Sequence, residues 1–123
     1  MKRLLCIAAL AFAVNGLAAA ADAPAQKNGD ILVNAAGMTL YTFDKDTANS
    51  GKSACNDACA KAWPPLTAEA GAAATGKFSV IHRDDGTQQW AYDGKPLYLY
   101  RSDQAPGDRN GDNFREVWHV VKD

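Results

Sequence analysis

A repeated motif constrains the fold of this chain more than any other feature of the sequence. The stretch 37–46 (GMTLYTFDKD) recurs 57 residues later at 94–103 (GKPLYLYRSD), and both copies follow the pattern G-x-x-L-Y-x-[FY]-x-x-D. An internal repeat of this kind indicates two supersecondary units that share one core. We therefore expect a tandem architecture, with the two repeats at about 31–66 and 88–121.

The first 21 residues have the character of a secretory signal peptide. A basic start (MKR) precedes an apolar run over 4–14, and small residues continue to Ala21. This run is shorter than the roughly 20 apolar residues that span a bilayer. Cys6 lies inside the run, where it is poorly placed for lipid attachment. We expect a periplasmic or secreted protein with no stable membrane insertion after the leader is removed.

The chain after the leader suffices for one small domain. Its first segment, 22–30 (DAPAQKNGD), is polar and contains Pro and Gly, so we predict a flexible tether followed by a single domain at 31–123. Without the leader the chain has 11 basic and 14 acidic residues and no basic cluster. This balance argues against nucleic acid and against an anionic membrane surface as partners.

The clearest local signal is a β-hairpin in the second repeat. Segments 88–92 and 95–100 are β-prone and flank Asp93-Gly94, a pair that favours a type I′ turn because both residues need positive φ. Counting outward from the turn separates the side chains onto two faces. One face carries Trp90, Tyr92, Leu97 and Leu99, and the other carries Tyr98 and Tyr100.

The other segments complete a mainly β assignment. We predict a first hairpin from 31–33 and 39–43, further strands at 78–83 and 114–121, and one helix at 53–63 that Ser53 could cap. The expected fold is a small antiparallel β domain of two pseudo-repeated hairpin units with one short helix between them.

Several separated motifs resemble one bacterial family. Besides the doubled motif they are Cys55 and Cys59, WPPL at 63–66, RDDG at 83–86, QWAY at 89–92 and the final Trp118. Together they are similar to the "secreted repeat of unknown function" family, also described as predicted lipoproteins with a conserved Tyr-x-(Phe/Trp/Tyr)-x-x-Asp motif. The resemblance covers nearly the whole chain after the leader. It implies an exported protein but no particular activity.

Cys55 and Cys59 are the cysteines that remain after the leader, and an even pair in an oxidising compartment predicts a disulfide. A redox-active pair is the sharper alternative, although the spacing is not C-x-x-C. Adding His82 and His119 gives weak candidates for a zinc or copper site, but nothing in their spacing supports it. The stretch 108–112 (DRNGD) resembles the opening of a calcium loop and is more simply explained by two turns.

The repeated motif also suggests a binding face. Its members are Tyr41, Phe43, Asp46, Tyr98, Tyr100 and Asp103. Exposed neighbouring rings would mark a surface for an unknown periplasmic protein or small ligand, whereas core packing and Asx turns are the simpler explanation. We find no catalytic motif and expect no enzyme and no cofactor. The leading hypothesis is a non-catalytic binding module, and the alternative is a thiol redox or metal-handling protein using Cys55 and Cys59.

Overall fold

The computed structural model describes residues 23–122, which form a mainly β domain with one short α-helix, as predicted. The predicted leader, 1–21, lies outside the described residues. In chain order the elements are β1 (Gln26–Asn28), β2 (Ile31–Val33), β3 (Tyr41–Phe43), α1 (Ala58–Ala62), β4 (Thr67–Ala68), β5 (Phe78–His82), β6 (Gln88–Tyr92), β7 (Lys95–Pro96), the 3-10 helix η2 (Phe114–Glu116) and β8 (Trp118–Val120).

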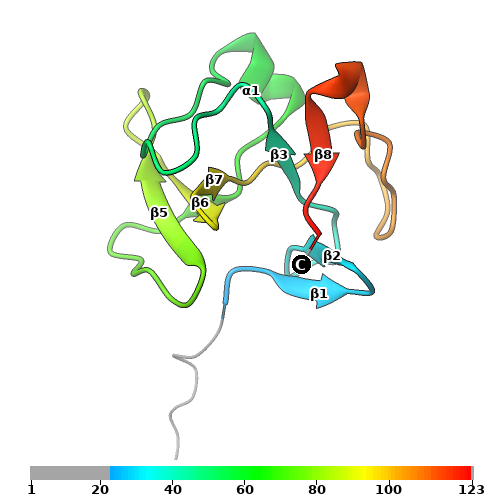
Figure 1. Ribbon diagram of the computed structural model, residues 1–123, viewed down its shortest axis with the longest axis horizontal. Coiled ribbons are helices and arrows are strands. Elements are labelled where there is room, and N and C mark those ends of the chain that lie inside the picture. Colours follow the sequence, from blue (N-terminus) through cyan, green and yellow to red (C-terminus); the bar gives the residue numbers. More distant parts are fainter. Residues whose placement is uncertain (1–22, 123) are drawn as a thin grey trace, which may run out of the picture.

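The strands form three small antiparallel sheets (Figure 1). β1 pairs with β2, and β3 pairs with β8. In the third sheet β5 lies along one side of β6, while β4 and β7 pair with opposite ends of its other side. Each sheet is small, so strand pairing between the sheets and side-chain packing must hold them together.

Each repeat supplies a strand to the other. β8, at the end of the second repeat, pairs with β3 of the first repeat. β4, directly after the first repeat, pairs with β6 of the second. At the centre the N–H groups of Tyr41 and Tyr98 each donate to the carbonyl oxygen of the other residue, at 2.8 and 2.9 Å. The repeats are therefore intertwined and do not lie side by side as separate units.

Backbone hydrogen bonds occur in matched pairs on either side of this centre. In each bond named here the N–H of the first residue donates to the carbonyl oxygen of the second. The first pair is Leu32 to Val121 (2.9 Å) and Trp90 to Leu66 (2.8 Å), and the second is Leu40 to Leu32 (3.1 Å) and Leu97 to Trp90 (3.0 Å). The third is Asp44 to Val117 (2.7 Å) and Arg101 to Ala62 (2.9 Å). In each pair the two donors occupy equivalent places in the two repeats, as do the two acceptors. The domain thus has an approximate two-fold symmetry that relates the two copies of the motif.

Two apolar clusters fill the interior, and the repeated Leu-Tyr step serves both. The aromatic core contains Ile31, Val33, Tyr41, Cys55, Trp63, Tyr98, Trp118 and Val120. The leucine core contains Ala25, Leu32, Leu40, Leu97 and Val121. Adjacent residues on a strand point to opposite faces. Each repeat therefore places its Leu in one cluster and its Tyr in the other.

The predicted hairpin of the second repeat is confirmed near its turn. Asp93 and Gly94 have φ of 54° and 83°, and Tyr92 pairs with Lys95. Counting outward from this turn also predicts that Gln88 pairs with Leu99, and that prediction is wrong, because Gln88 pairs with Ala68. β7 ends at Pro96, and the N–H of Leu99 donates to the carbonyl of Pro64 instead. The faces were predicted correctly, because Leu97 and Leu99 pack in or against the leucine core whereas Tyr98 and Tyr100 pack in or against the aromatic core.

The helix is shorter than predicted. It begins at Ala58, not near Ser53, and Asp57 before it has a positive φ of 55°. Tertiary hydrogen bonds hold the preceding segment in a non-helical path. The Ser53 hydroxyl lies 2.6 Å from the Tyr98 hydroxyl, and the Arg83 guanidinium donates to the carbonyl of Cys55. The intrinsic preference of so short a segment is too weak to oppose such contacts.

The last strand and the tether also differ from the prediction. Residues 114–116 form η2, with positive φ at Arg115 and Glu116, and this turn directs Phe114 toward the rings of Trp63 and Tyr100. The strand itself begins at Trp118. Within the predicted tether, 22–30, residues 26–28 form β1 and pair with β2. Because their side chains are polar and exposed, the composition of this segment gave no indication of an edge strand.

The equivalent Leu residues give a direct test of the repeat. Leu40 and Leu97 are both fully buried in the leucine core. We expect Leu40→Ala and Leu97→Ala each to lower the free energy of unfolding by about 2–5 kcal/mol, as for other buried Leu truncations. Urea denaturation measures both values. Leu99→Ala, at a half-buried position, is the control and should cost less; a value near zero for Leu40 or Leu97 would contradict the shared core.

Candidate functional site

The polar groups of the repeated motif bond across the two repeats. The Tyr41 hydroxyl donates to Oδ2 of Asp103, and the Tyr98 hydroxyl donates to Oδ2 of Asp46, both at 2.6 Å. Each Asp therefore accepts from the Tyr of the other repeat, not from its own. The spacing gave no signal for this arrangement, because each Asp lies in a turn, where the N–H of Asp46 donates to the carbonyl of Phe43 and that of Asp103 to the carbonyl of Tyr100.

The second oxygen of each Asp holds a loop. Asp46 Oδ1 accepts the N–H of Ala54 at 2.6 Å, and Asp103 Oδ1 accepts the N–H of Asn110 at 3.0 Å. Both carboxylates thus connect a buried phenol to a backbone segment. The motif Asp residues order neighbouring loops, as the sequence suggested, and in addition join the two repeats.

The two Tyr–Asp pairs differ in their surroundings. The N–H of Gly111 donates to the Tyr41 hydroxyl at 3.2 Å. The Tyr98 hydroxyl instead lies beside Ser53, whose Oγ accepts from Nη1 of Arg83 at 3.1 Å. Arg83 is buried, with 5% of its surface exposed, and its Nε has no hydrogen-bond partner within 23–122. The pair of Tyr98 is thus linked through Ser53 to a buried cation.

Burial changes the acidity of these groups. Burial first, and then the hydrogen bond to Asp103, raises the pKa of Tyr41 well above its usual value. Burial and the hydrogen bond to Asp46 do the same to the pKa of Tyr98. Burial also raises the pKa of Asp46, while its bonds from Tyr98 and Ala54 act in the opposite direction. Both phenols are therefore neutral donors at ordinary pH.

Four aromatic rings form a continuous stack inside the aromatic core. Trp63 and Trp118 lie at its centre, with ring centroids 3.8 Å apart and planes 2° from parallel. Phe43 stacks on Trp118 at 4.2 Å, and Tyr100 stacks on Trp63 at 4.0 Å. Each outer ring rests on the Trp of the other repeat. Both Trp residues are buried, whereas both outer rings are half-buried.

The predicted binding face needs correction. Tyr41 and Tyr98 are fully buried and Asp103 is 7% exposed, so these three residues belong to the interior and not to a surface platform. The reason is that the two repeats cover each other along both faces of the motif strands. Phe43, Asp46 and Tyr100 are half-buried. Each repeat thus has one partly exposed ring, that of Phe43 or of Tyr100.

The cysteine pair forms the predicted disulfide. Cys55 and Cys59 are bonded to each other, with Cα atoms 5.2 Å apart. Cys55 is fully buried and Cys59 is half-buried. The weak metal candidates are not brought together, since the two thiols are used by the disulfide and His119 lies against Asp44. The described part of the chain has no group of three or more His, Cys, Asp or Glu side chains placed to hold a metal ion.

The stretch that resembled a calcium loop uses its carboxylates within the chain. Asp108 Oδ2 accepts the N–H groups of Gln104 and Ala105 at 2.9 and 3.1 Å. Asp112 Oδ1 accepts the N–H of Val120 at 3.1 Å. These bonds support the simpler interpretation of successive turns.

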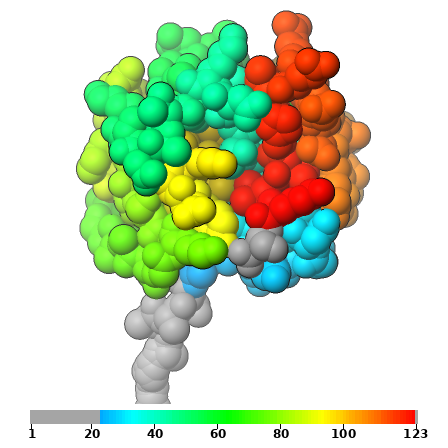
Figure 2. Space-filling view, viewed as in Figure 1, coloured from blue at the N-terminus to red at the C-terminus, as the bar shows by residue number. Residues whose placement is uncertain are grey.

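A groove at the junction of the repeats was not predicted from the sequence. It has a volume of about 270 Å³ and lies between the outer face of β3 and β8 and the β6–β7 turn. Figure 2 shows the hairpin tip (yellow) and the end of β8 (red) facing one another there. Its lining residues are Thr42, Asp44, Tyr92, Asp93, Lys95, His119, Val120, Val121 and Lys122. We call this feature the junction groove.

A pair of polar side chains lies in the junction groove. His119 Nε2 is 2.8 Å from Asp44 Oδ2, and both residues are partly exposed. Thr42 is the cross-strand partner of His119, so these three residues share the outer face of the β3–β8 sheet. Sequence alone could not find this site, because its residues come from separate segments of both repeats.

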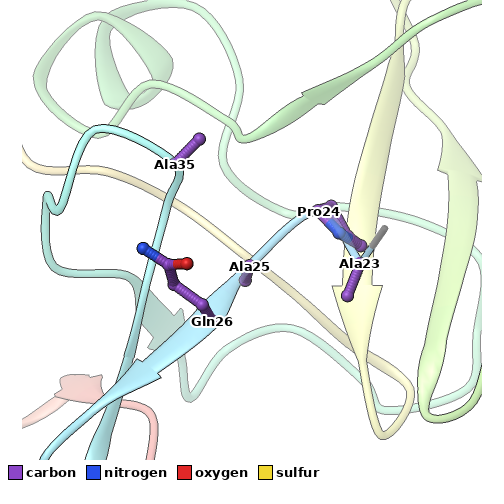
Figure 3. Close-up of a pocket in the computed structure, with 5 residues that line it drawn as sticks. All are labelled: Ala23, Pro24, Ala25, Gln26 and Ala35. Carbon is purple, nitrogen blue, oxygen red and sulfur yellow. The ribbon is translucent and has the colours of Figure 1, made fainter. Parts of the chain in front are cut away.

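A second cleft lies beside β1 (Figure 3). It has a volume of about 400 Å³ and is lined by Ala23, Pro24, Ala25, Gln26 and Ala35. Gln26 alone among these contributes a polar side chain. The cleft therefore offers little chemistry for recognition, and the junction groove is the better candidate.

The fold thus defines a class of protein: a tandem-repeat β domain whose halves exchange strands and share a polar motif. A family model described as "Secreted repeat of unknown function" matches residues 24–67 and 79–122. The chain belongs to this family, as the motifs indicated. The comparisons with curated proteins and with solved structures gave no match. Among residues 23–122, no helix is long and apolar enough to cross a membrane.

Proposed function

We propose that this protein is a non-catalytic binding module of the periplasm or the extracellular medium, and that its ligand occupies the junction groove. The observation that carries the proposal is the distribution of polar groups. The Tyr and Asp side chains of the motif bond to each other in the interior. The groove, in contrast, presents charged side chains at the surface of the intertwined repeats.

The charges of the groove indicate the kind of ligand. Lys95, Lys122 and Asp93 are exposed, and none of them forms an ion pair within 23–122. Asp44 is already paired with His119. Two free cations beside one free anion favour a small polar ligand that carries both an anionic and a cationic group.

Native mass spectrometry of the exported protein tests this function. We expect wild-type protein, purified under mild conditions from the compartment into which it is exported, to carry a small species that denaturation releases. The groove variant Lys95→Ser/Lys122→Ser should lose it. The control variant Lys45→Ser/Lys61→Ser makes the same charge change at exposed positions outside the groove and should retain it. Equal retention by both variants would contradict the assignment of the groove.

The disulfide supports a second candidate, a thiol redox protein. Because Cys55 is fully buried, an attacking thiolate would have to reach the sulfur of half-buried Cys59. The reduction potential of the pair, measured against glutathione or dithiothreitol, distinguishes the two functions. Structural disulfides lie below about −300 mV, so a value in that range would contradict the redox function and leave the disulfide as a brace for α1.

A further inference from the structure

We propose that the aromatic core is a site of one-electron oxidation. A radical cation formed on the stacked Trp63 and Trp118 then oxidises the Tyr of one Tyr–Asp pair. An external one-electron oxidant, such as an oxidised metal complex or a diffusing radical, would withdraw an electron from the stack. Tyr41 or Tyr98 would then reduce the Trp radical and lose its phenolic proton to Asp103 or Asp46.

The rings are placed for electron transfer between neighbours. The two Trp rings are in stacking contact, so a radical cation formed on one is shared readily with the other. Tyr41 lies edge-on to Trp63, with centroids 5.4 Å apart, and Tyr98 lies edge-on to Trp118 at 5.1 Å. Each Trp therefore has one fully buried Tyr in edge contact that can serve as an electron donor. Tyr100, half-buried and stacked on Trp63, is the point at which an oxidant can approach.

The Asp carboxylates can accept the phenolic proton that is released when Tyr41 or Tyr98 is oxidised. A phenol that loses an electron becomes a strong acid and must release its proton, and Tyr41 and Tyr98 have no surface exposed to bulk solvent. Each hydroxyl already donates to a carboxylate oxygen at 2.6 Å, within the range for direct proton transfer. The step balances: a Trp radical cation, a phenol and a carboxylate give neutral Trp, a neutral tyrosyl radical and a carboxylic acid.

The site is separate from the junction groove. The stack lies on the inner face of β3 and β8, through Phe43 and Trp118, whereas Thr42, Asp44 and His119 lie on the outer face. Variants of the core therefore leave the groove side chains in place. The inference does not depend on the binding function, and either proposal can fail alone.

Flash oxidation of the full exported chain tests the proposal. The probe is tris(bipyridine)ruthenium(III), produced by a laser flash with a cobalt(III) ammine as the terminal electron acceptor. We expect a Trp radical that disappears as a neutral tyrosyl radical forms. Transient absorption and electron paramagnetic resonance detect the two species. The decay should be slower in deuterium oxide, because a proton moves in the same step.

The variants separate this role from packing. Tyr41→Phe and Tyr98→Phe should each retain part of the tyrosyl signal, and the double variant should lose it. Tyr92→Phe, which packs against the leucine core, is the matched control and should leave the signal unchanged. Asp46→Asn and Asp103→Asn keep a hydrogen-bond acceptor but no strong base. They should prolong the Trp radical and reduce the tyrosyl yield.

Two results would overturn the proposal, provided that circular dichroism shows each variant folded. One is a tyrosyl signal that persists in the Tyr41→Phe/Tyr98→Phe variant and disappears in Tyr100→Phe or Tyr92→Phe. The other is a Trp radical lifetime that neither Asp→Asn substitution nor deuterium oxide changes. If the double Phe variant does not fold, the Asp→Asn variants and the isotope effect on wild-type protein still decide the question.

Discussion

Replacing Trp118 with Ala is expected to lower the free energy of unfolding by about 3–5 kcal/mol, and Trp63→Ala should have an effect of the same size. Each ring is almost fully buried and stacks on two others, so truncation leaves a cavity and removes two ring contacts at once. Denaturant titration measures the loss. The similarity of the two values would reflect their equivalent places in the two repeats.

Trp90 provides the control for this prediction. It is half-buried, packs against the leucine core and lies outside the stack. Trp90→Phe should leave the near-ultraviolet circular dichroism of the coupled Trp pair intact, whereas Trp63→Phe and Trp118→Phe should each remove it. A coupled signal that survives loss of one of the stacked Trp residues would contradict the stacked geometry.

The architecture could be predicted from the sequence because the repeat is strong. Recurrence of the motif indicated two related units with one core, and Asp93-Gly94 placed the hairpin turn correctly. Alternation along 95–100 assigned Leu97 and Tyr98 to opposite faces, and the structure shows that both faces are buried. These predictions rest on local geometry, which tertiary contacts did not oppose.

The exchange of strands could not be predicted, because no local rule says whether a strand pairs within its own repeat. β8 lies next to β3 although they are far apart in the chain, and the two motif copies, which carry the Tyr–Asp bonds, meet through the pairing of Tyr41 with Tyr98. The shortened helix has a related cause. Tyr98 of the second repeat and Arg83, which precedes that repeat, contact residues 53–56, and these contacts outweigh a weak local preference.

The junction groove is a further product of strand exchange. Asp44 and His119 had no visible relation in the sequence, and the structure brings their side chains to 2.8 Å because the second repeat ends beside the first. The groove is lined by residues of both repeats, and the pairing of β3 with β8 brings them together. This explains why the search for short motifs found no such site, and why the motif itself proved to be interior.

Alkaline unfolding should be steep, because the two buried phenols can ionise readily only after the protein unfolds. The pKa values of Tyr41 and Tyr98 are raised by burial and by the bonds to Asp103 and Asp46. In the unfolded chain both have the ordinary pKa near about 10. The stability they contribute is therefore fully present below that pH. Above that pH the stability is lost at about 1.4 kcal/mol per pH unit for each Tyr, or roughly 2.8 kcal/mol per pH unit for both.

Denaturant titrations at a series of pH values above the ordinary Tyr pKa measure this slope. Tyr41→Phe and Tyr98→Phe should each reduce it by about 1.4 kcal/mol per pH unit, whatever they do to stability at neutral pH. The comparison uses the slope of the free energy of unfolding against pH. A constant loss of stability, caused by leaving Asp103 or Asp46 without its phenol donor, does not change this slope. An unchanged slope in both variants would mean that the phenols ionise in the folded protein, and the Tyr–Asp pairs would then be open to solvent, not sealed in the core.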